Sequence, residues 1–360
     1  MDSDRQSVIV TGISGNLGQR LLPFLGRFNV IGVDVKPPSG AAPDRFESMD
    51  FGREVSCRRL QKLIEETDAC AVIHLAFVLD PQRTGVLDVD QMWQINVAGT
   101  ARVMEAISVA NRYGARVSRF VFPSSVAAYG PNTPGPVRED HALGAHTLPY
   151  AVHKMECDRV VQNRYESLGH CTTYMLRPHI FTGATMQNYM VGALRGSPLG
   201  PSRRAEKMRA KGKRLPLMLP FGDRYLENRL QFVHVDDMAR LIAWIARRDA
   251  EGNALHILNV AGRGEPMKIT ECAEVAHSKI VRLPKGACGW ALQKLWDWGI
   301  SSIPPEALPY MIGSYTMNTS RLQQLLGSEY DQVIKYTVRD ALADSFNSVT
   351  VEAQTAASVS

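Results

Sequence analysis

The feature that most constrains the fold of this 360-residue chain is a regular alternation along the sequence. Over roughly the first 180 residues, short apolar runs alternate with helix-like stretches. The apolar runs are nearly continuous, which is typical of parallel strands buried on both faces. The expected strands are Ser7–Thr11, Val30–Val33, Ala69–Ala76, Arg119–Ser125 and Thr173–Arg177. The expected helices are Leu17–Phe28, Val89–Tyr113 and Pro149–Leu168. This βαβ order predicts an α/β fold with a doubly wound parallel sheet.

The pattern changes after about Gly183, where proline and basic residues accumulate. Further along, Leu230–Val235 and Leu255–Val260 are expected strands, and Asp236 or Asp237 is the expected N-cap of a helix over Met238–Arg247. We therefore expect two domains and a disordered tail. The sheet domain takes residues 1–183 plus 230–250, a smaller mixed α/β substrate lobe takes 184–229 plus 251–346, and the tail takes 347–360.

The composition, 45% hydrophobic and 21% charged residues, is ordinary for a folded soluble protein. No apolar stretch is long enough to span a membrane, the N-terminus lacks the layout of a secretory signal, and the six cysteines are scattered. Reduced thiols in the cytoplasm are the expectation, with neither a disulfide framework nor a metal site. A homodimer is the candidate assembly.

A basic tract, Arg203–Arg214, carries much of the net charge of +5. It holds seven Lys or Arg residues against one Glu, either as a solvated surface or as a receptor for an anionic small-molecule substrate. No nucleic-acid partner is expected, because the tract lacks interleaved aromatic residues.

A glycine-rich turn follows the first expected strand. Its glycines, Gly12, Gly15 and Gly18, have the spacing G-x-x-G-x-x-G between a strand and a helix. Such a turn lets the backbone approach a pyrophosphate, and the helix N-terminus offers free N–H groups. The turn predicts a Rossmann-like dinucleotide site whose contacts are Gly12, Ser14, Gly15, Asn16, Leu17 and Gly18.

An acidic residue ends the second expected strand. Asp34 can accept hydrogen bonds from the adenosine ribose and repels a 2′-phosphate, so NAD is the expected cofactor rather than NADP. Asp50, after a further short strand, is placed to reach the adenine edge, although an Asp there is often only a turn residue.

Three polar residues form the candidate catalytic set. Tyr150 and Lys154 are four apart, so on a helix they share a face, and the lysine ammonium would lower the tyrosine pKa toward neutrality. The same ammonium would hold the nicotinamide ribose. Ser125 ends the strand before Tyr150, and the carboxyl ends of parallel strands are where open α/β folds bind ligands.

Together these segments resemble the extended short-chain dehydrogenase/reductase family, of the NAD-dependent epimerase/dehydratase type. The matching segments are Thr11–Gly18, His74–Ala76, Asn96–Thr100, Ser124–Ser125 with Tyr129–Gly130, Tyr150 with Lys154, Leu176–Pro178 and Phe232–Asp237. The resemblance implies that Ser125, Tyr150 and Lys154 are catalytic. It also implies that Leu75 and Ala76 line the cofactor, that Asn96 supports the active-site strands, and that Pro178 flanks the nicotinamide.

Two departures from the family pattern bear on the substrate. Ser125 is followed by Val126 and Ala127, where the dehydratases carry an acid that protonates a departing hydroxyl. Leu230 stands where many sugar-nucleotide enzymes carry a diphosphate-binding Arg, and Arg229 is one residue early, so in a strand it faces the other way.

These observations predict an NAD-dependent oxidoreductase or epimerase that transfers a hydride at a carbinol carbon of a sugar, sugar nucleotide or related alcohol. A ketone or hydroxysteroid-type dehydrogenase is the alternative enzyme. A non-catalytic NAD-sensing regulator is the alternative from another class, and the retention of Tyr150 and Lys154 argues against it.

Overall fold

The centre of the molecule is a seven-stranded parallel sheet in the order β12-β7-β5-β4-β1-β2-β3. The computed structural model describes residues 5–79 and 88–347. The strands are β1 Ser7–Thr11, β2 Asn29–Asp34, β3 Arg45–Ser48, β4 Ala69–His74, β5 Arg119–Pro123, β7 Thr172–Pro178 and β12 Leu255–Val260. Because the chain builds outward in both directions from β1, the sheet is doubly wound and Rossmann-like, as the sequence predicted.

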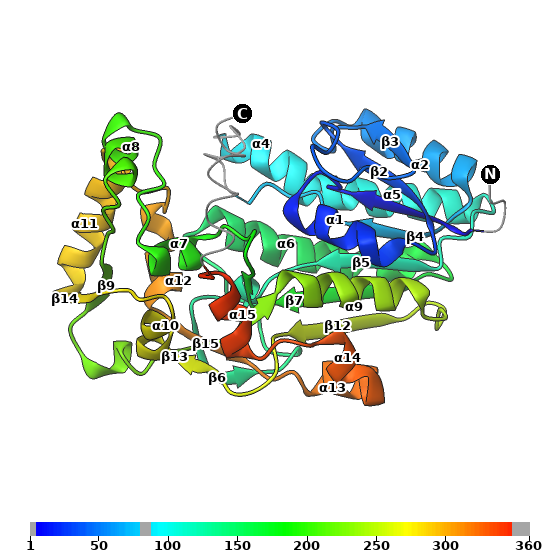
Figure 1. The fold of residues 1–360 in the computed structure, drawn as a ribbon. Coiled ribbons are helices and arrows are strands. Elements are labelled where there is room, and N and C mark those ends of the chain that lie inside the picture. The colour runs from blue at the N-terminus through cyan, green and yellow to red at the C-terminus, as the bar shows by residue number, and fades with distance from the viewer. Residues whose placement is uncertain (1–4, 80–87, 348–360) are drawn as a thin grey trace.

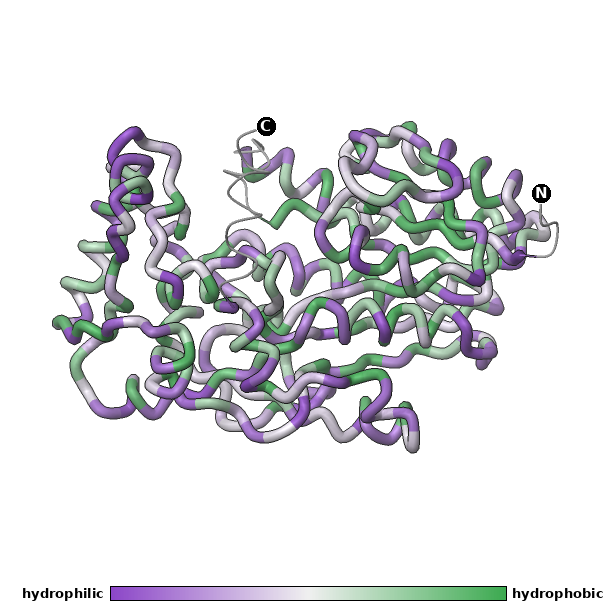
Figure 2. Tube along the Cα trace, in the orientation of Figure 1, coloured by the Kyte–Doolittle hydropathy of each residue, from purple (hydrophilic) through white to green (hydrophobic). Residues whose placement is uncertain are grey.

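Helices cover both faces of this sheet (Figure 1). One face packs against α1 Asn16–Leu21, the short 3₁₀ turn η1 Leu22–Leu25 and α9 Val235–Arg247. The other packs against α2 Val55–Thr67, α5 Gly99–Arg112 and α6 Pro149–Arg164, with the 3₁₀ turn η4 Tyr165–Leu168 after α6. The hydropathy colouring in Figure 2 shows apolar residues concentrated along these central strands.

The helix expected over Val89–Tyr113 is present but contains an irregular turn. It consists of α4 Val89–Trp93, a π-helical turn η2 Gln94–Ala98, and α5. Wide turns of this kind are frequent at functional sites. Here the turn carries Asn96, whose side chain is fully buried.

The N-cap of α9 differs from the prediction. His234 is the cap, because its ring nitrogen accepts the Asp236 backbone N–H at 3.1 Å. Asp236 instead forms an ion pair with Arg20 at 2.6 Å, and the buried Asp237 accepts the backbone N–H groups of two later residues. Both aspartates therefore tie α9 to other segments.

A smaller lobe with its own hydrophobic core lies beyond the carboxyl ends of the strands. Its helices are α7 Tyr189–Arg195, α8 Arg203–Ala210, α10 Ile269–Val275, α11 Lys285–Asp297, α12 Leu308–Ile312 and α15 Val338–Asp344. Its paired strands are β9 Leu217–Pro220 with β14 Ile280–Leu283, and β10 Arg229–Leu230 with β13 Met267–Lys268.

Two strand pairs join the lobe to the sheet domain. They are β8 Ile180–Thr182 with β11 Phe232–His234, and β6 Asn132–Val137 with β15 Ser314–Met317. The short turns between the main elements are η3 Val126–Tyr129, η5 Asp223–Tyr225, η6 Pro305–Ala307 and η7 Gly327–Glu329.

The expected division of the chain needs one correction. The substrate lobe was expected to take residues 251–346, but β12 pairs with β7 at the edge of the main sheet. The helices α13 Ser320–Leu326 and α14 Tyr330–Val333 place Leu322 and Val333 in the core of the sheet domain. The edge of β7 offers unpaired backbone groups that a further strand can bind, and the sequence-based division did not take this pairing into account. Residues 348–360 of the expected tail lie outside the described residues.

Candidate functional site

The glycine turn lies at the carboxyl end of β1 and packs directly against the end of β4. Gly12 has a φ of 70°, and a Cβ atom built on it would lie 2.5 Å from the Ala76 nitrogen. A Cβ on Gly18 would lie 2.6 Å from the Gly12 oxygen. Only glycine therefore fits at either position, and the turn lies against the Leu75–Ala76 backbone, where a ligand can approach it closely.

Asp34 closes this turn from the neighbouring strand. Its carboxylate accepts the backbone N–H of Ser14 at 3.0 Å and that of Val35 at 2.7 Å. The structure thus brings together Asp34 and the turn residues, as a dinucleotide site requires. Gly15 is the N-cap of α1, and Asn16 donates to the Thr185 carbonyl at 3.0 Å, which links the turn to the segment after β8.

Asp50 lies in a turn that it stabilises itself. Its carboxylate accepts the Gly52 backbone N–H at 2.9 Å and lies 3.6 Å from the Arg53 guanidinium. These contacts account for an Asp at this position without a ligand, so contact between Asp50 and an adenine stays a prediction.

Asn96 fixes the segment that follows β4. Its side-chain oxygen accepts the Val78 N–H at 2.7 Å, and its amide nitrogen lies 3.1 Å from the Val78 carbonyl and 3.2 Å from the His153 ring. The π-helical turn therefore holds residues 75–78 in place beside α6. The role that the resemblance implied for Asn96, support of the active-site strands, stays a prediction.

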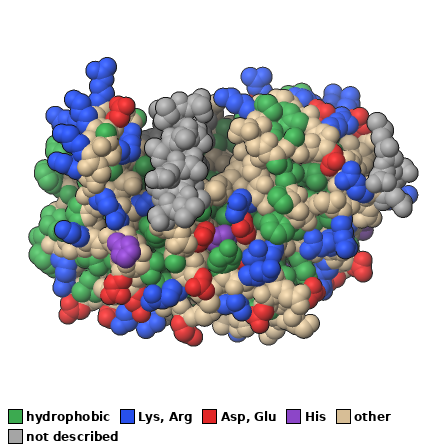
Figure 3. Space-filling view, in the orientation of Figure 1, with side chains coloured by type: hydrophobic (Ala, Val, Ile, Leu, Met, Phe, Trp, Pro, Cys, Tyr) green, Lys and Arg blue, Asp and Glu red, His purple; other side chains and the backbone are tan. Residues whose placement is uncertain are grey.

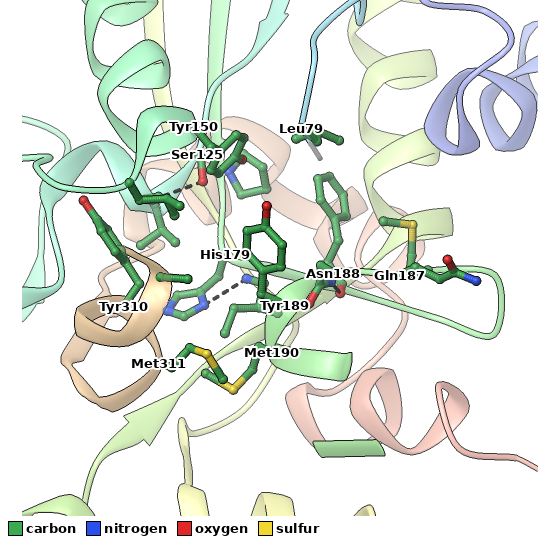
Figure 4. A pocket seen from close by; sticks show the side chains of 18 of the residues that line it. Leu79, Ser125, Tyr150, His179, Gln187, Asn188, Tyr189, Met190, Tyr310 and Met311 are labelled. Carbon is green, nitrogen blue, oxygen red and sulfur yellow. Dashed lines mark hydrogen bonds between the residues drawn. The ribbon is translucent and has the colours of Figure 1, made fainter. Parts of the chain in front are cut away.

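Tyr150 and Lys154 lie in the first turns of α6, with Ser125 beside them at the end of β5. The Lys154 side chain is 5% exposed and donates from Nζ to the Pro123 carbonyl at 2.7 Å. Its ammonium also lies 3.6 Å from the centre of the Phe77 ring. Figure 4 shows Tyr150 and Ser125 next to each other at one end of a cavity. The structure thus brings the three candidate catalytic residues together.

The electrostatics of this group differ from the expectation in one respect. Burial raises the pKa of Tyr150 to about 12, against a smaller opposing effect of the hydrogen bond with Ser125. Burial also lowers the pKa of Lys154 to about 8. The sequence analysis expected Lys154 to bring the Tyr150 pKa toward neutrality. The shift instead comes from burial, the hydrogen bond with Ser125 and the charge of Asp158, and Lys154 does not lower this pKa here. Tyr150 is therefore a protonated phenol at neutral pH, ready to donate a proton.

A cavity of about 400 Å³ opens beside these residues, between the sheet domain and the lobe. Ser125, Tyr150 and Pro178 form one part of its lining. Much of the remainder comes from β8, α7, η6 and α12, including Phe181, Met190 and Met311. The sequence analysis missed these lobe residues, because apolar and aromatic side chains on short separate segments carry no recognisable spacing.

Both departures from the family pattern are visible in the structure. Val126 and Ala127 are buried and line the cavity directly after Ser125, so no carboxylate follows the serine there. Leu230 is 1% exposed in the lobe core, whereas Arg229 is exposed and donates to the Pro266 carbonyl. Neither Leu230 nor Arg229 therefore supplies a cation to the cavity.

The basic tract forms α8 and the turn after it. Lys and Arg side chains gather at that end of the molecule (Figure 3). Arg209 donates to the Pro198 and Gly200 carbonyls, and Arg214 donates to carbonyls that include those of Arg195 and Ala276. These two arginines therefore stabilise the backbone of the lobe.

The described part of the chain contains neither a His/Cys/Asp/Glu group able to hold a metal ion nor a helix long and apolar enough to cross a membrane.

The sheet is doubly wound, its glycine turn faces an acidic residue on the next strand, and a Ser–Tyr–Lys group lies beside it. These features together are typical of the short-chain dehydrogenase/reductase class of dinucleotide-binding folds. A sequence model of the NAD dependent epimerase/dehydratase family matches residues 8–261. The chain belongs to this family, as the resemblance indicated.

Among curated proteins, an uncharacterised epimerase/dehydratase of Staphylococcus saprophyticus is 26% identical over 171 residues, which cover 46% of this chain and 50% of that protein. A Staphylococcus aureus counterpart is 25% identical over 173 residues, with the same shares covered. The chain spans about half the length of the curated relatives it matches.

Similar solved structures cover nearly the whole chain. MoeE5 in complex with UDP-glucuronic acid and NAD superposes with a TM-score of 0.65 at 19% identity, over 97% of this chain and 99% of that one. The UDP-glucose 4-epimerase of Thermus thermophilus, in complex with NAD, also gives 0.65 at 19% identity, over 95% and 99%. The dTDP-glucose 4,6-dehydratase of Bacillus anthracis gives 0.64 at 16% identity, over 97% and 99%. These likenesses show that the fold is shared.

Proposed function

We propose that this protein transfers a hydride between NAD and the carbinol carbon of a small-molecule alcohol, with Tyr150 as the acid–base residue. The observation that carries the proposal is the meeting of Ser125 and Tyr150 at one end of a substrate-sized cavity, with Lys154 buried one helical turn after Tyr150 on α6. Family membership and the NAD complexes of similar structures support the same cofactor.

The residues around the glycine turn fit NAD. The glycines at 12 and 18 let the turn pack closely against Leu75, Ala76 and its own backbone, and in this tight turn the N–H groups at the start of α1 would face a pyrophosphate, while Asp34 would accept the ribose hydroxyls. The other predicted cofactor contacts are Ser14, Asn16, Leu17, Asp50, Leu75, Ala76, Asn96, Tyr150, Lys154 and Pro178. When bound, NAD supplies the carbon that accepts or returns the hydride.

Each residue of the catalytic group has a distinct task. Tyr150 takes the hydroxyl proton during oxidation and returns it during reduction. Ser125 hydrogen-bonds the reacting oxygen. Lys154, fixed by the Pro123 carbonyl, places a positive charge near the phenol and the nicotinamide ribose.

The cavity favours hydride transfer without loss of water. Elimination needs an acid that protonates the departing hydroxyl, and the residues after Ser125 are Val126 and Ala127. Net dehydrogenation and epimerisation remain the two reactions that this arrangement supports. The similar structures include enzymes that bind UDP-glucuronic acid and UDP-glucose, which makes a sugar carbinol one substrate to test.

Two further expectations concern the cellular context. All six cysteines are free thiols, which favours a reducing compartment such as the cytoplasm. We also propose a homodimer, which analytical ultracentrifugation of the full chain tests directly; a monomer at all accessible concentrations would contradict it.

Turnover of the cofactor distinguishes the candidate functions. Purified protein is incubated with NAD and a panel of sugar nucleotides, free sugars and secondary alcohols, while NADH absorbance and product stereochemistry are followed. A dehydrogenase accumulates NADH, an epimerase changes the product without NADH accumulation, and a sensor binds NAD without either change. The proposal fails if NAD binds but no member of a broad panel reacts.

A further inference from the structure

The cavity beside Tyr150 has a lining without charged side chains among the described residues. Among the described residues that line it, none is Lys, Arg, Asp or Glu. Figure 4 shows Met190 and Met311 on the opposite side of the cavity from Tyr150 and Ser125. A bound substrate would therefore contact mainly thioether, aromatic and aliphatic groups.

Several polar groups of the lining are already hydrogen-bonded within the protein. The Nε2 atom of His179 lies 2.9 Å from the Tyr315 carbonyl oxygen, and its Nδ1 atom accepts the Ile180 N–H at 2.9 Å. The Asn188 side chain donates to the Phe181 carbonyl and accepts the Val191 N–H. These side chains have little capacity left to recognise a polar ligand.

Two tyrosines of the lining are occupied in the same way. The Tyr315 hydroxyl donates to the Tyr310 carbonyl at 2.8 Å. The Tyr310 hydroxyl lies 3.1 Å from both the backbone nitrogen and the carbonyl oxygen of His146. Both rings therefore present their carbon atoms to the cavity, while their hydroxyls form hydrogen bonds with backbone groups. The remaining polar side chains of the lining are Tyr150 and Ser125 at one end and Gln187, Tyr189 and Ser302 elsewhere, all of them uncharged.

Nearby groups that could supply positive charge are neutral or otherwise engaged. Burial lowers the pKa of His179 to about 4, so this lining histidine is neutral at physiological pH. The guanidinium of Arg195, at the end of α7, donates to the Ser345 carbonyl and lies 5.8 Å from the centre of the Phe346 ring. Arg209 donates to the backbone of residues 198–200. A diphosphate in the cavity would lose its hydration without gaining a counter-charge, which is strongly unfavourable.

We infer that the substrate is a neutral alcohol or ketone with an apolar body, an inference that rests on the proposed function. Its single reacting oxygen would lie at Tyr150 and Ser125, and its hydrocarbon part would lie against Phe181, Met190 and Met311. In oxidation, the carbinol C–H and O–H bonds break and a C=O bond forms. The hydride with its electron pair reduces NAD, and the proton goes to the Tyr150 oxygen when that residue is in its phenolate form.

Binding of a graded ketone series to the NAD-loaded full chain tests the inference. The probes are cyclohexanone, 4-methylcyclohexanone and 4-tert-butylcyclohexanone, with UDP-glucose as the charged comparison, and isothermal titration calorimetry gives each Kd. Burial of each added carbon is expected to tighten binding roughly three- to fourfold. Ketone affinities that do not change with added carbon, together with tighter binding of UDP-glucose, would overturn the inference.

A matched pair of variants locates the effect. Leu199 lines the cavity and is 39% exposed, whereas Val281 on β14 is also 39% exposed and is not among the lining residues. Leu199→Ser is expected to weaken binding of 4-tert-butylcyclohexanone at least threefold, and Val281→Ser to leave it unchanged. An equal effect of both variants contradicts binding in this cavity.

Turnover of the same ketones with NADH separates this inference from the proposed function. Ketones that bind with the expected gradient but do not oxidise NADH support the substrate class and contradict the hydride-transfer proposal. Turnover of UDP-glucose without measurable ketone binding supports hydride transfer and contradicts an apolar substrate.

Discussion

The Nζ atom of Lys154 donates a hydrogen bond to the Pro123 carbonyl at 2.7 Å, which ties α6 to the carboxyl end of strand β5. Ser125 follows Pro123 by two residues, and Tyr150 precedes Lys154 by one helical turn. This one contact therefore sets the relative position of the serine and the tyrosine. The same contact holds the Lys154 ammonium at a buried position, where desolvation lowers the pKa of this lysine.

Replacement of Lys154 should impair two steps at once. In Lys154→Met, the charge near the ribose site and the hydrogen bond to Pro123 are both lost. Loss of a hydrogen bond to a charged group costs about 1.5–3 kcal/mol, so we expect NAD affinity to fall roughly tenfold or more, together with kcat. Calorimetry and steady-state kinetics measure the two effects. Lys62→Met, on the exposed face of α2, is the control. Unchanged NAD affinity in Lys154→Met would show that this lysine does not contact the cofactor.

Tyr150→Phe should separate binding from chemistry. The variant keeps the ring and removes only the hydroxyl that carries the proton. General acid–base catalysis contributes about 10²–10⁴-fold, so kcat should fall at least 100-fold while NAD affinity stays nearly normal. Ser125→Ala should cost less, because a serine hydroxyl stabilises charge without carrying the proton.

The control for that experiment is Tyr113→Phe, since Tyr113 is exposed and lies at the end of α5. Near-normal turnover of the true substrate by Tyr150→Phe would falsify the assignment of Tyr150 as the acid–base residue.

The two reaction directions should respond differently to pH. Because burial raises the pKa of Tyr150 to about 12, the phenol is protonated across the neutral range. Alcohol oxidation needs the phenolate, so kcat/KM in that direction should rise from pH 6 to pH 8. Ketone reduction needs the phenol, so its rate should stay flat over the same range. Initial rates with NAD and with NADH in matched buffers provide the measurement, and a flat oxidation profile argues against a titrating Tyr150.

Asp34 should set the cofactor preference. Its carboxylate is positioned by the Ser14 and Val35 N–H groups beside the glycine turn. In Asp34→Ala, we expect the ratio of NAD to NADP affinity to fall about tenfold, because ribose hydrogen bonds are lost and repulsion of a 2′-phosphate disappears. Fluorescence titration with both nucleotides measures this ratio.

Asp44→Ala is the matched control, because Asp44 also accepts a backbone N–H, that of Val30 at 2.8 Å, at the opposite end of β2. An unchanged nucleotide ratio in Asp34→Ala, with a normal melting temperature, would contradict the role of Asp34.

His74 should make the fold sensitive to acid. It is fully buried between Thr11 and Thr100, and burial lowers its pKa to about 3. The unfolded chain takes up a proton near pH 6.5, whereas the folded protein does not. Unfolding therefore becomes more favourable as the pH falls from 6.5 toward 3.

Proton uptake by His74 on unfolding should lower the free energy of unfolding by about 2–3 kcal/mol at pH 4.5. His74→Asn should be less stable than the wild type at pH 7, because packing and a hydrogen bond change. The difference in the free energy of unfolding between wild type and variant should be smaller by about 2–3 kcal/mol at pH 4.5. Urea unfolding at both pH values tests this, and a stability difference that is independent of pH would exclude a role for His74 protonation.

Local patterns in the sequence were sufficient for the sheet and the cofactor turn. Continuous apolar runs predicted the strands, because parallel strands buried on both faces need apolar residues throughout. The glycines predicted the turn, because at Gly12 and Gly18 any side chain would collide with backbone. Spacing placed Tyr150 and Lys154 on one face of α6, since the side chains follow the helical repeat.

Tertiary structure decided the features that depend on distant segments. The pKa of Tyr150 follows from burial, which the spacing of Tyr150 and Lys154 does not encode. The edge strand β12 joins the main sheet from the second half of the chain, because backbone pairing with β7 is available there. The uncharged cavity combines β8, α7 and α12, each short and without a motif, so its chemistry emerged only when folding brought them around Tyr150.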